Sequence, residues 1–102
     1  MKRIYIAGPV TGHADNNRDA FRKAAEELAD RGFATCNPVA TIERLESEPN
    51  HREAMRLCIG WMVDCDGIAL LPGWQDSAGA LLEHTVAYEC GMEIRPLAGW
   101  LR

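Results

Sequence analysis

Glu83 is the residue whose surroundings point most directly to chemistry. It follows a segment, residues 72–77, that predicts the end of a buried strand and a glycine-containing turn, after which a helix is expected. On that helix its neighbours three and four positions away are small or apolar: Gly79, Ala80, Val86 and Ala87. A carboxylate without a local cation is either solvated on the helix surface or placed for a reaction. We interpret Glu83 as a catalytic carboxylate.

The elements that must position Glu83 follow from the alternation of short apolar runs with helical periodicity, which is typical of βαβ units. The expected strands are residues 3–7, 33–36, 67–71 and 92–97. Pro96 interrupts the last of them and favours a place at the sheet edge. The pattern predicts an α/β fold. We expect a single doubly wound domain, Rossmann-like or flavodoxin-like, with a four-stranded parallel sheet and helices on both faces.

The helix ends carry recognisable signals. Asn16 or Asn17 can cap the first helix through its side chain. Asn50 and Glu53 have the spacing of a capping box at the start of the second. The third is expected from about residue 77 to residue 90, where a glycine follows.

Two other stretches are harder to interpret. Residues 39–49 combine charge with a proline, which favours a mobile excursion that contains at most a helical turn over 41–46. Trp100 and Leu101 are large apolar residues that a domain of this size has difficulty burying alone. We therefore expect a homodimer or higher homo-oligomer, formed through the tail and the last helix.

Parallel α/β sheets bind ligands beyond the carboxyl ends of their strands. The turn Gly8-Pro9-Val10-Thr11-Gly12 follows the first strand, and Pro72-Gly73-Trp74 follows the third. Asp76, Ser77 and Glu83 come next along the chain. The residues that could bind a ligand or take part in a reaction are thus expected to meet at one edge of the sheet. The glycines in the first turn also fit a plain strand-to-helix connection.

Composition narrows the classes of partner. The chain has 102 residues and a formal charge of −4, with its basic residues scattered, so duplex nucleic acid is not expected to bind. No apolar run is long enough for a signal peptide or a membrane span, and we expect a cytoplasmic protein. The four cysteines show no metal-ligand spacing and are interpreted as buried apolar residues. No metal and no cofactor are expected.

At two motifs the chain resembles the nucleoside 2-deoxyribosyltransferase-like superfamily, and most closely a small uncharacterised branch of it in bacteria and phages. The strand Ile4-Tyr5-Ile6-Ala7-Gly8-Pro9 is similar to the opening strand of that family. Asp76-Ser77, Gly79 and Glu83 match its closing motif, and Gly91 falls eight residues after the Glu, as in the family. The resemblance follows the order of elements over residues 1–102. It implies one nucleoside 2-deoxyribosyltransferase-like domain.

The resemblance also implies roles for individual residues. Glu83 would be the nucleophile that attacks the anomeric carbon of the sugar, and Tyr5 would orient its carboxylate. The sugar or its 5′-phosphate would be held by the first turn and the second motif: Gly8, Pro9, Val10, Thr11, Gly12, Asp76, Ser77 and Gly79. For Trp74 we expect a surface on which the nucleobase stacks, with packing at the base of the loop as the alternative.

One position departs from the family pattern. The family has an Asp that protonates the leaving base, and Cys58 stands at that position. A thiol is a poor substitute for a carboxylic acid, so the acid role is lost or passes to Asp64 or another group. Residue 80 is also an Ala where the family commonly has a Thr, and Ala78 is an extra residue.

Two functions remain. The first is an enzyme that hydrolyses or transfers the N-glycosidic bond of a nucleoside or nucleoside monophosphate through a covalent glycosyl-enzyme on Glu83. The second is a non-catalytic nucleotide-binding module that keeps the pocket without efficient chemistry. Tyr5 and Glu83 favour the enzyme, and Cys58 favours the binding module.

Overall fold

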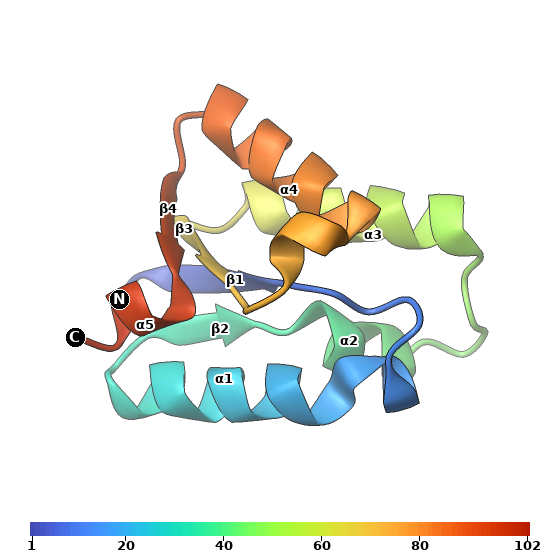
Figure 1. Cartoon of the computed structure of the whole chain (residues 1–102), viewed down its shortest axis with the longest axis horizontal. Coiled ribbons are helices and arrows are strands. Elements are labelled where there is room, and N and C mark those ends of the chain that lie inside the picture. Colours follow the sequence, from blue (N-terminus) through green and yellow to red (C-terminus); the bar gives the residue numbers. More distant parts are fainter.

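The computed structural model describes all 102 residues of the chain. Its four strands are β1 (Arg3–Ala7), β2 (Ala34–Cys36), β3 (Gly67–Leu70) and β4 (Glu93–Pro96). They form one sheet in the order β2-β1-β3-β4, and every neighbouring pair is parallel (Figure 1). The chain crosses from one half of the sheet to the other in the connection from β2 to β3. The neighbouring strands β1 and β3 therefore flank the switch point at which such folds bind ligands.

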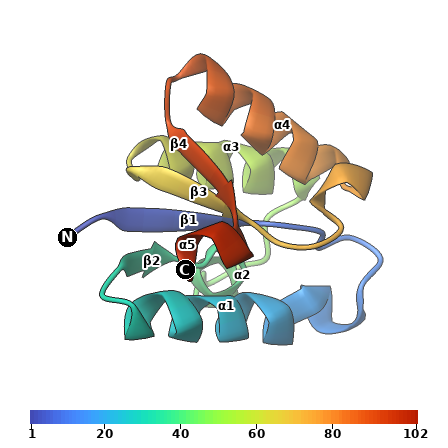
Figure 2. The ribbon, with the colours of Figure 1, turned by 60° about the vertical axis from the view of Figure 1, so that its left-hand side comes forward.

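Helices cover both faces of the sheet, which confirms the predicted doubly wound α/β fold (Figures 1 and 2). They are α1 (Arg18–Asp30), α2 (Pro38–Glu43), α3 (His51–Val63), α4 (Ala78–Glu89) and α5 (Leu97–Trp100). Short 3-10 turns at Ala14–Asn17 and Trp74–Asp76 precede α1 and α4. None of the helices combines the length and the apolar character that crossing a membrane requires.

The core has two layers because side chains of a strand alternate between its faces. Ile4 and Ile6 of β1 pack with residues of α1 and α5 in one cluster. Tyr5 and Ala7 point to the other face and pack with residues of α3, β3 and α4. All four side chains are fully buried, so β1 is the central strand that joins the two layers.

The predicted cap of α1 is confirmed in its position but not in its side-chain bond. Asn17 occupies the N-cap position, but its side chain makes no capping bond, and its Nδ2 instead donates to the carbonyl oxygen of Pro9. Asp15, Asn16 and Asn17 all have positive φ angles, between 50° and 60°. Asparagine and aspartate tolerate this left-handed conformation better than other residues with a side chain. The segment therefore folds back toward the loop after β1.

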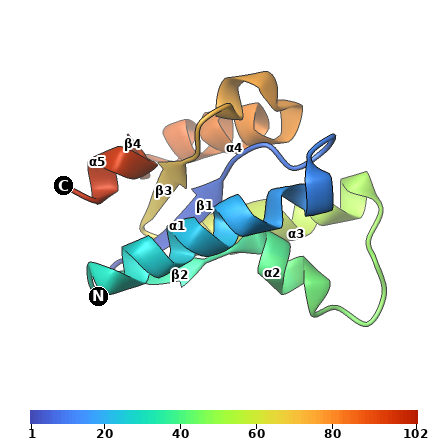
Figure 3. The ribbon, with the colours of Figure 1, turned by 60° about the horizontal axis from the view of Figure 1, so that its bottom comes forward.

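The expected excursion over residues 39–49 is also wrong in its first half, because Pro38–Glu43 forms the helix α2. Asn37 caps it through a side-chain oxygen that accepts from the amide of Ala40, and Pro38 occupies the first turn. The connection to α3 leaves the body of the fold only after α2 (Figure 3). The capping box at the start of α3 is confirmed, with Asn50 and Glu53 bonded reciprocally.

The C-terminal segment is not a reason to expect self-association. Trp100 is 4% exposed within the single chain, and its indole Nε1 donates to the carbonyl oxygen of Ile68 at 3.0 Å. The tail therefore needs no second subunit to bury it. The large apolar residues that stay exposed on the last predicted helix are Leu81, Leu82 and Tyr88 of α4. Self-association stays a prediction that rests on α4 alone.

Candidate active site

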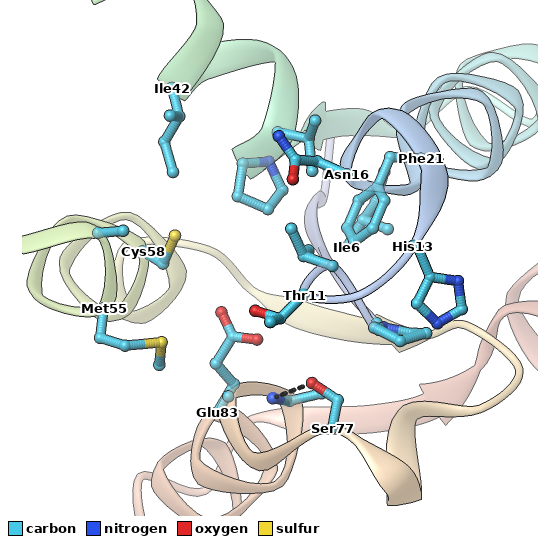
Figure 4. A pocket seen from close by; sticks show the side chains of 18 of the residues that line it. Ile6, Thr11, His13, Asn16, Phe21, Ile42, Met55, Cys58, Ser77 and Glu83 are labelled. Carbon is cyan, nitrogen blue, oxygen red and sulfur yellow. Dashed lines mark hydrogen bonds between the residues drawn. The ribbon is translucent and has the colours of Figure 1, made fainter. Parts of the chain in front are cut away.

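A cavity of about 790 Å³ opens beyond the carboxyl ends of β1 and β3 (Figure 4). Its walls come from the loop after β1, from α2, from the first half of α3, and from the turn that leads into α4. The volume lies in the range of small-molecule sites. Most of the residues that the sequence places at one sheet edge therefore line a single cavity.

Glu83 is the one charged residue that the fold buries, with 6% of its surface exposed. Its carboxylate points from α4 into the middle of the cavity (Figure 4). Gly79 and Ala80, one turn earlier on α4, are small residues that line the same cavity. Burial raises the pKa of Glu83 to about 7, and a hydrogen bond from Tyr5 opposes that rise. The alternative that Glu83 is a solvated residue on the helix surface is excluded, because burial has removed most of the water around its carboxylate.

Tyr5 supplies the polar partner of Glu83. Its hydroxyl donates a hydrogen bond to Oε2 of Glu83, and its ring is fully buried under α3 and α4. Burial raises the pKa of Tyr5, and the negative charge of Glu83 raises it further. The phenol therefore stays protonated, and its hydrogen is donated to Glu83. The bond holds one carboxylate oxygen and leaves Oε1 for a ligand.

Cys58 lies across the cavity from Glu83, on α3 (Figure 4). Burial raises the pKa of its thiol to about 11, and the charge of Glu83 also raises it, while a hydrogen bond with Tyr5 lowers it. At neutral pH the side chain is therefore a neutral thiol. Asp64, the alternative acid, follows the last residue of α3 and does not line the cavity, because it lies near the amino end of β3.

Some residues of the turn after β1 line the cavity, and others serve the backbone conformation or the packing of the fold. Four of its predicted residues line the cavity: Gly8, Pro9, Val10 and Thr11. Gly12 does not line it, and its φ of +84° shows that it serves the turn. Gly8 also has a packing role, because a Cβ there would lie 2.8 Å from Cβ of Leu71. The two glycines are thus explained by backbone conformation and close approach.

The turn into α4 brings Asp76, Ser77 and Gly79 to the cavity, as predicted. The Ser77 hydroxyl oxygen accepts a hydrogen bond from the amide of Ala80 at 3.2 Å, which caps α4. This bond fixes the first turn of the helix and with it the direction in which Glu83 projects. The Ser77 hydroxyl hydrogen remains available to a ligand.

Trp74 does not line the cavity, so the structure does not bring it to the predicted stacking position. Its ring stacks on the imidazole of His84, with 4.8 Å between centroids and 15° between planes. Gly73, at a φ of 87°, turns the chain just before it. Trp74 packs against the core cluster beneath α4, which is the alternative role that the sequence left open.

Several lining residues were not predicted. An apolar wall comes mainly from α2, α1 and α3: Pro38, Val39, Ile42, Phe21 and Met55. Polar side chains complete it at His13, Asn16, Glu43 and His51. The signal for the α2 part was present in the dipeptide Asn37-Pro38, since Asn at the cap followed by Pro in the first turn is a strong helix start. Nowhere do three or more His, Cys, Asp or Glu side chains gather to hold a metal ion.

Comparison with known proteins finds a family model that matches most of the chain. A family model described as "Domain of unknown function (DUF4406)" matches residues 2–95, most of the chain. Tyr5, Cys58 and Glu83 all fall within the matched range. No curated protein matches the chain.

Proposed function

We propose that this chain, which belongs to the DUF4406 family, breaks the N-glycosidic bond of nucleosides and passes the sugar to water or to a second base. One observation carries the proposal. A single buried carboxylate, Glu83, is held by a phenol donor, Tyr5, and faces a cavity of about 790 Å³. The resemblance to the nucleoside 2-deoxyribosyltransferase-like superfamily rests on two motifs, one of which contains Tyr5 and the other Glu83. It supports the same reading.

The proposed chemistry is nucleophilic. An oxygen of Glu83 forms a bond to the anomeric carbon while the bond from that carbon to the base nitrogen breaks, and its electron pair leaves with the base. Water or another base then attacks the glycosyl ester and releases the carboxylate. Tyr5 keeps Oε2 occupied, so Oε1 is the oxygen that reacts. Its hydrogen bond also offsets part of the cost of ionising a buried carboxylate, and ionisation is required for attack.

Cys58 sets the expected rate. A leaving base needs a proton, and a thiol with a pKa of about 11 is a weak acid for that purpose. Water reaching the open cavity then has to supply it. We therefore propose slow turnover, fastest for bases that leave readily as anions or arrive already protonated.

The charges in the cavity favour nucleosides over nucleoside monophosphates. Asp76 and Glu83 both line it, and neither has an ion-pair partner in the chain. Glu43 is compensated by Arg18, whose Nε lies 2.7 Å from its carboxylate. Acids without an ion-pair partner repel a phosphate dianion, and this repulsion is the basis of the proposed preference for nucleosides.

The test is release of free base. Purified protein is incubated with the common deoxynucleosides and ribonucleosides and with their 5′-monophosphates, and bases are separated by chromatography. We expect release from at least one nucleoside and less from its monophosphate. Glu83→Gln should abolish the release, whereas Glu89→Gln, an exposed acid on the same helix, should not. Activity that survives Glu83→Gln would remove Glu83 as the nucleophile.

A second candidate is a binding module that takes a nucleoside without cleaving it. Cys58 at the position of the acid is the observation in its favour. Calorimetric titration distinguishes the two candidates: saturable nucleoside binding with no base released by any substrate would establish the module and contradict the enzyme.

A further inference from the structure

A second cavity, of about 290 Å³, lies along the free edge of β2. It shares no lining residue with the first cavity. The helix α2 separates them: Val39 and Ile42 face the first cavity, while Thr41 and Arg44 face the second. A ligand here would therefore be bound independently of the candidate active site.

Two guanidinium groups line this cavity. Arg3 comes from β1 and Arg44 from the residue that ends α2, so the fold brings them together from distant parts of the sequence. Neither forms an ion pair. By contrast, Lys2, which precedes Arg3, pairs with Glu93, and Arg18 pairs with Glu43, which precedes Arg44. Two cations without carboxylate partners in one hollow are suited to an anion, because guanidinium groups bind carboxylate or phosphate oxygens in pairs.

Neutral donors point the same way. In the parallel pairing of β1 and β2, the amide of Ala34 donates to the carbonyl oxygen of Lys2 at 2.9 Å. Amides of a strand alternate in direction, so the next one, that of Thr35, is turned outward to the free edge. Asn37 uses its Oδ1 to cap α2, which leaves its amide hydrogens without a partner. Both residues line the cavity.

A thiol, that of Cys36, also lines this cavity. Hydrogen bonding by the Cys65 thiol lowers the pKa of Cys36, and the Arg3 guanidinium lowers it too, while burial opposes both. Cys36 is half-buried and lines the cavity, so it also serves as a built-in probe of occupancy.

We propose that the cavity at the edge of β2 binds a small oxyanion, a phosphate or carboxylate group, between Arg3 and Arg44. The outward amide of Thr35 and the side-chain amide of Asn37 are further donors to it. The site is distinct from the nucleoside site proposed above and does not depend on it.

The first test is a titration followed by two-dimensional proton–nitrogen NMR, at constant ionic strength. Inorganic phosphate and malonate are added separately, with chloride as the reference salt. We expect saturable shifts confined to residues 35–44 and the amide of Arg3. The stronger of the two probes then identifies phosphate or dicarboxylate as the preferred group. Shifts that do not saturate with either probe, or that chloride reproduces, would overturn the proposal.

The second test measures protection of Cys36 from N-ethylmaleimide, with peptides analysed by mass spectrometry. At about four times the dissociation constant of the anion, alkylation of Cys36 should slow about fivefold, in proportion to the unliganded fraction. The exposed Cys90 is the internal control and should react at an unchanged rate. Equal slowing of both cysteines, or none at Cys36 while the NMR shifts also fail to saturate, contradicts the site.

Variants tie the effect to the arginines. Arg44→Gln should weaken binding about tenfold, since a hydrogen bond to a charged group is lost. Arg44 is exposed and unpaired, so the fold should not suffer. Arg52→Gln is the matched control, because Arg52 is exposed on α3 and lines neither cavity. Equal affinities in the two variants would show that the cavity does not hold the anion.

Discussion

Replacing Glu83 with glutamine should change how the stability of the fold depends on pH. In the folded chain burial raises the pKa of Glu83 from 4.5 to about 7. The unfolded chain releases this proton near pH 4.5, so between the two values the folded state holds one proton more. The contribution of Glu83 to the free energy of unfolding is thus complete below pH 4.5. It is lost as pH rises to about 7.

The size of that loss follows from the two pKa values. At about 1.4 kcal/mol for each pH unit, the interval from 4.5 to about 7 corresponds to about 3 kcal/mol. Glutamine cannot ionise, and its amide oxygen can still accept the hydrogen bond from Tyr5. The variant should therefore lack this pH-dependent loss. Any constant cost of burying the amide group shifts its stability equally at every pH.

The assay is urea unfolding, followed by tryptophan fluorescence, of both proteins from about pH 4.5 to about pH 8. We expect the free energy of unfolding of Glu83→Gln, minus that of the original chain, to rise by about 3 kcal/mol across this range. Glu89→Gln, which alters an exposed acid on α4, is the control and should show a flat difference. A flat difference for Glu83→Gln as well would refute the argument that burial holds a proton on Glu83.

Four other variants test separate parts of the structure. Tyr5→Phe removes the bond that lowers the pKa of Glu83, so the pH at which Glu83 ionises should rise, measured as the midpoint of the same stability profile. Cys58→Asp restores a carboxylic acid in the cavity and should raise the rate of base release about a hundredfold; an unchanged rate in the chromatographic assay would contradict the proposed cause of slow turnover. Gly60→Ala should stabilise the chain to urea by about 0.5–1 kcal/mol, because Gly60 lies in α3 and a Cβ there meets no atom within 4 Å. Asn50→Ala removes the capping box of α3 and should cost about 1 kcal/mol in the same measurement.

The strands show why much of the fold could be predicted. Each expected strand is found within one or two residues of its predicted bounds. Short apolar runs that are bounded by glycine or proline are local signals, so the sequence is enough to find them. The capping box at Asn50 and Glu53 is equally local. The direction of pairing also followed from the sequence, since strands that alternate with helices are parallel.

Other features escaped prediction because their causes are not local. Asn17 has the right type for a cap, but the carbonyl oxygen of Pro9 takes its side chain. Trp74 follows a strand at the cavity edge, yet its ring turns to His84. From the sequence, Trp100 was expected to need a partner subunit to bury it, but the fold places it against Ile68 of the same chain. In each case a contact with a residue outside the local helix, strand or turn decides among conformations that the local residues permit.

The candidate site divides along the same line. The sequence by itself determined that Glu83 lies on a helix after a buried strand, with small residues beside it and no cation within one turn. Only the tertiary structure decided that this face is turned inward. Burial of α4 against β1 removes water from the carboxylate, brings the phenol of Tyr5 to it, and raises its pKa. Desolvation depends on every element packed around a group, and 78 residues separate these two partners along the chain.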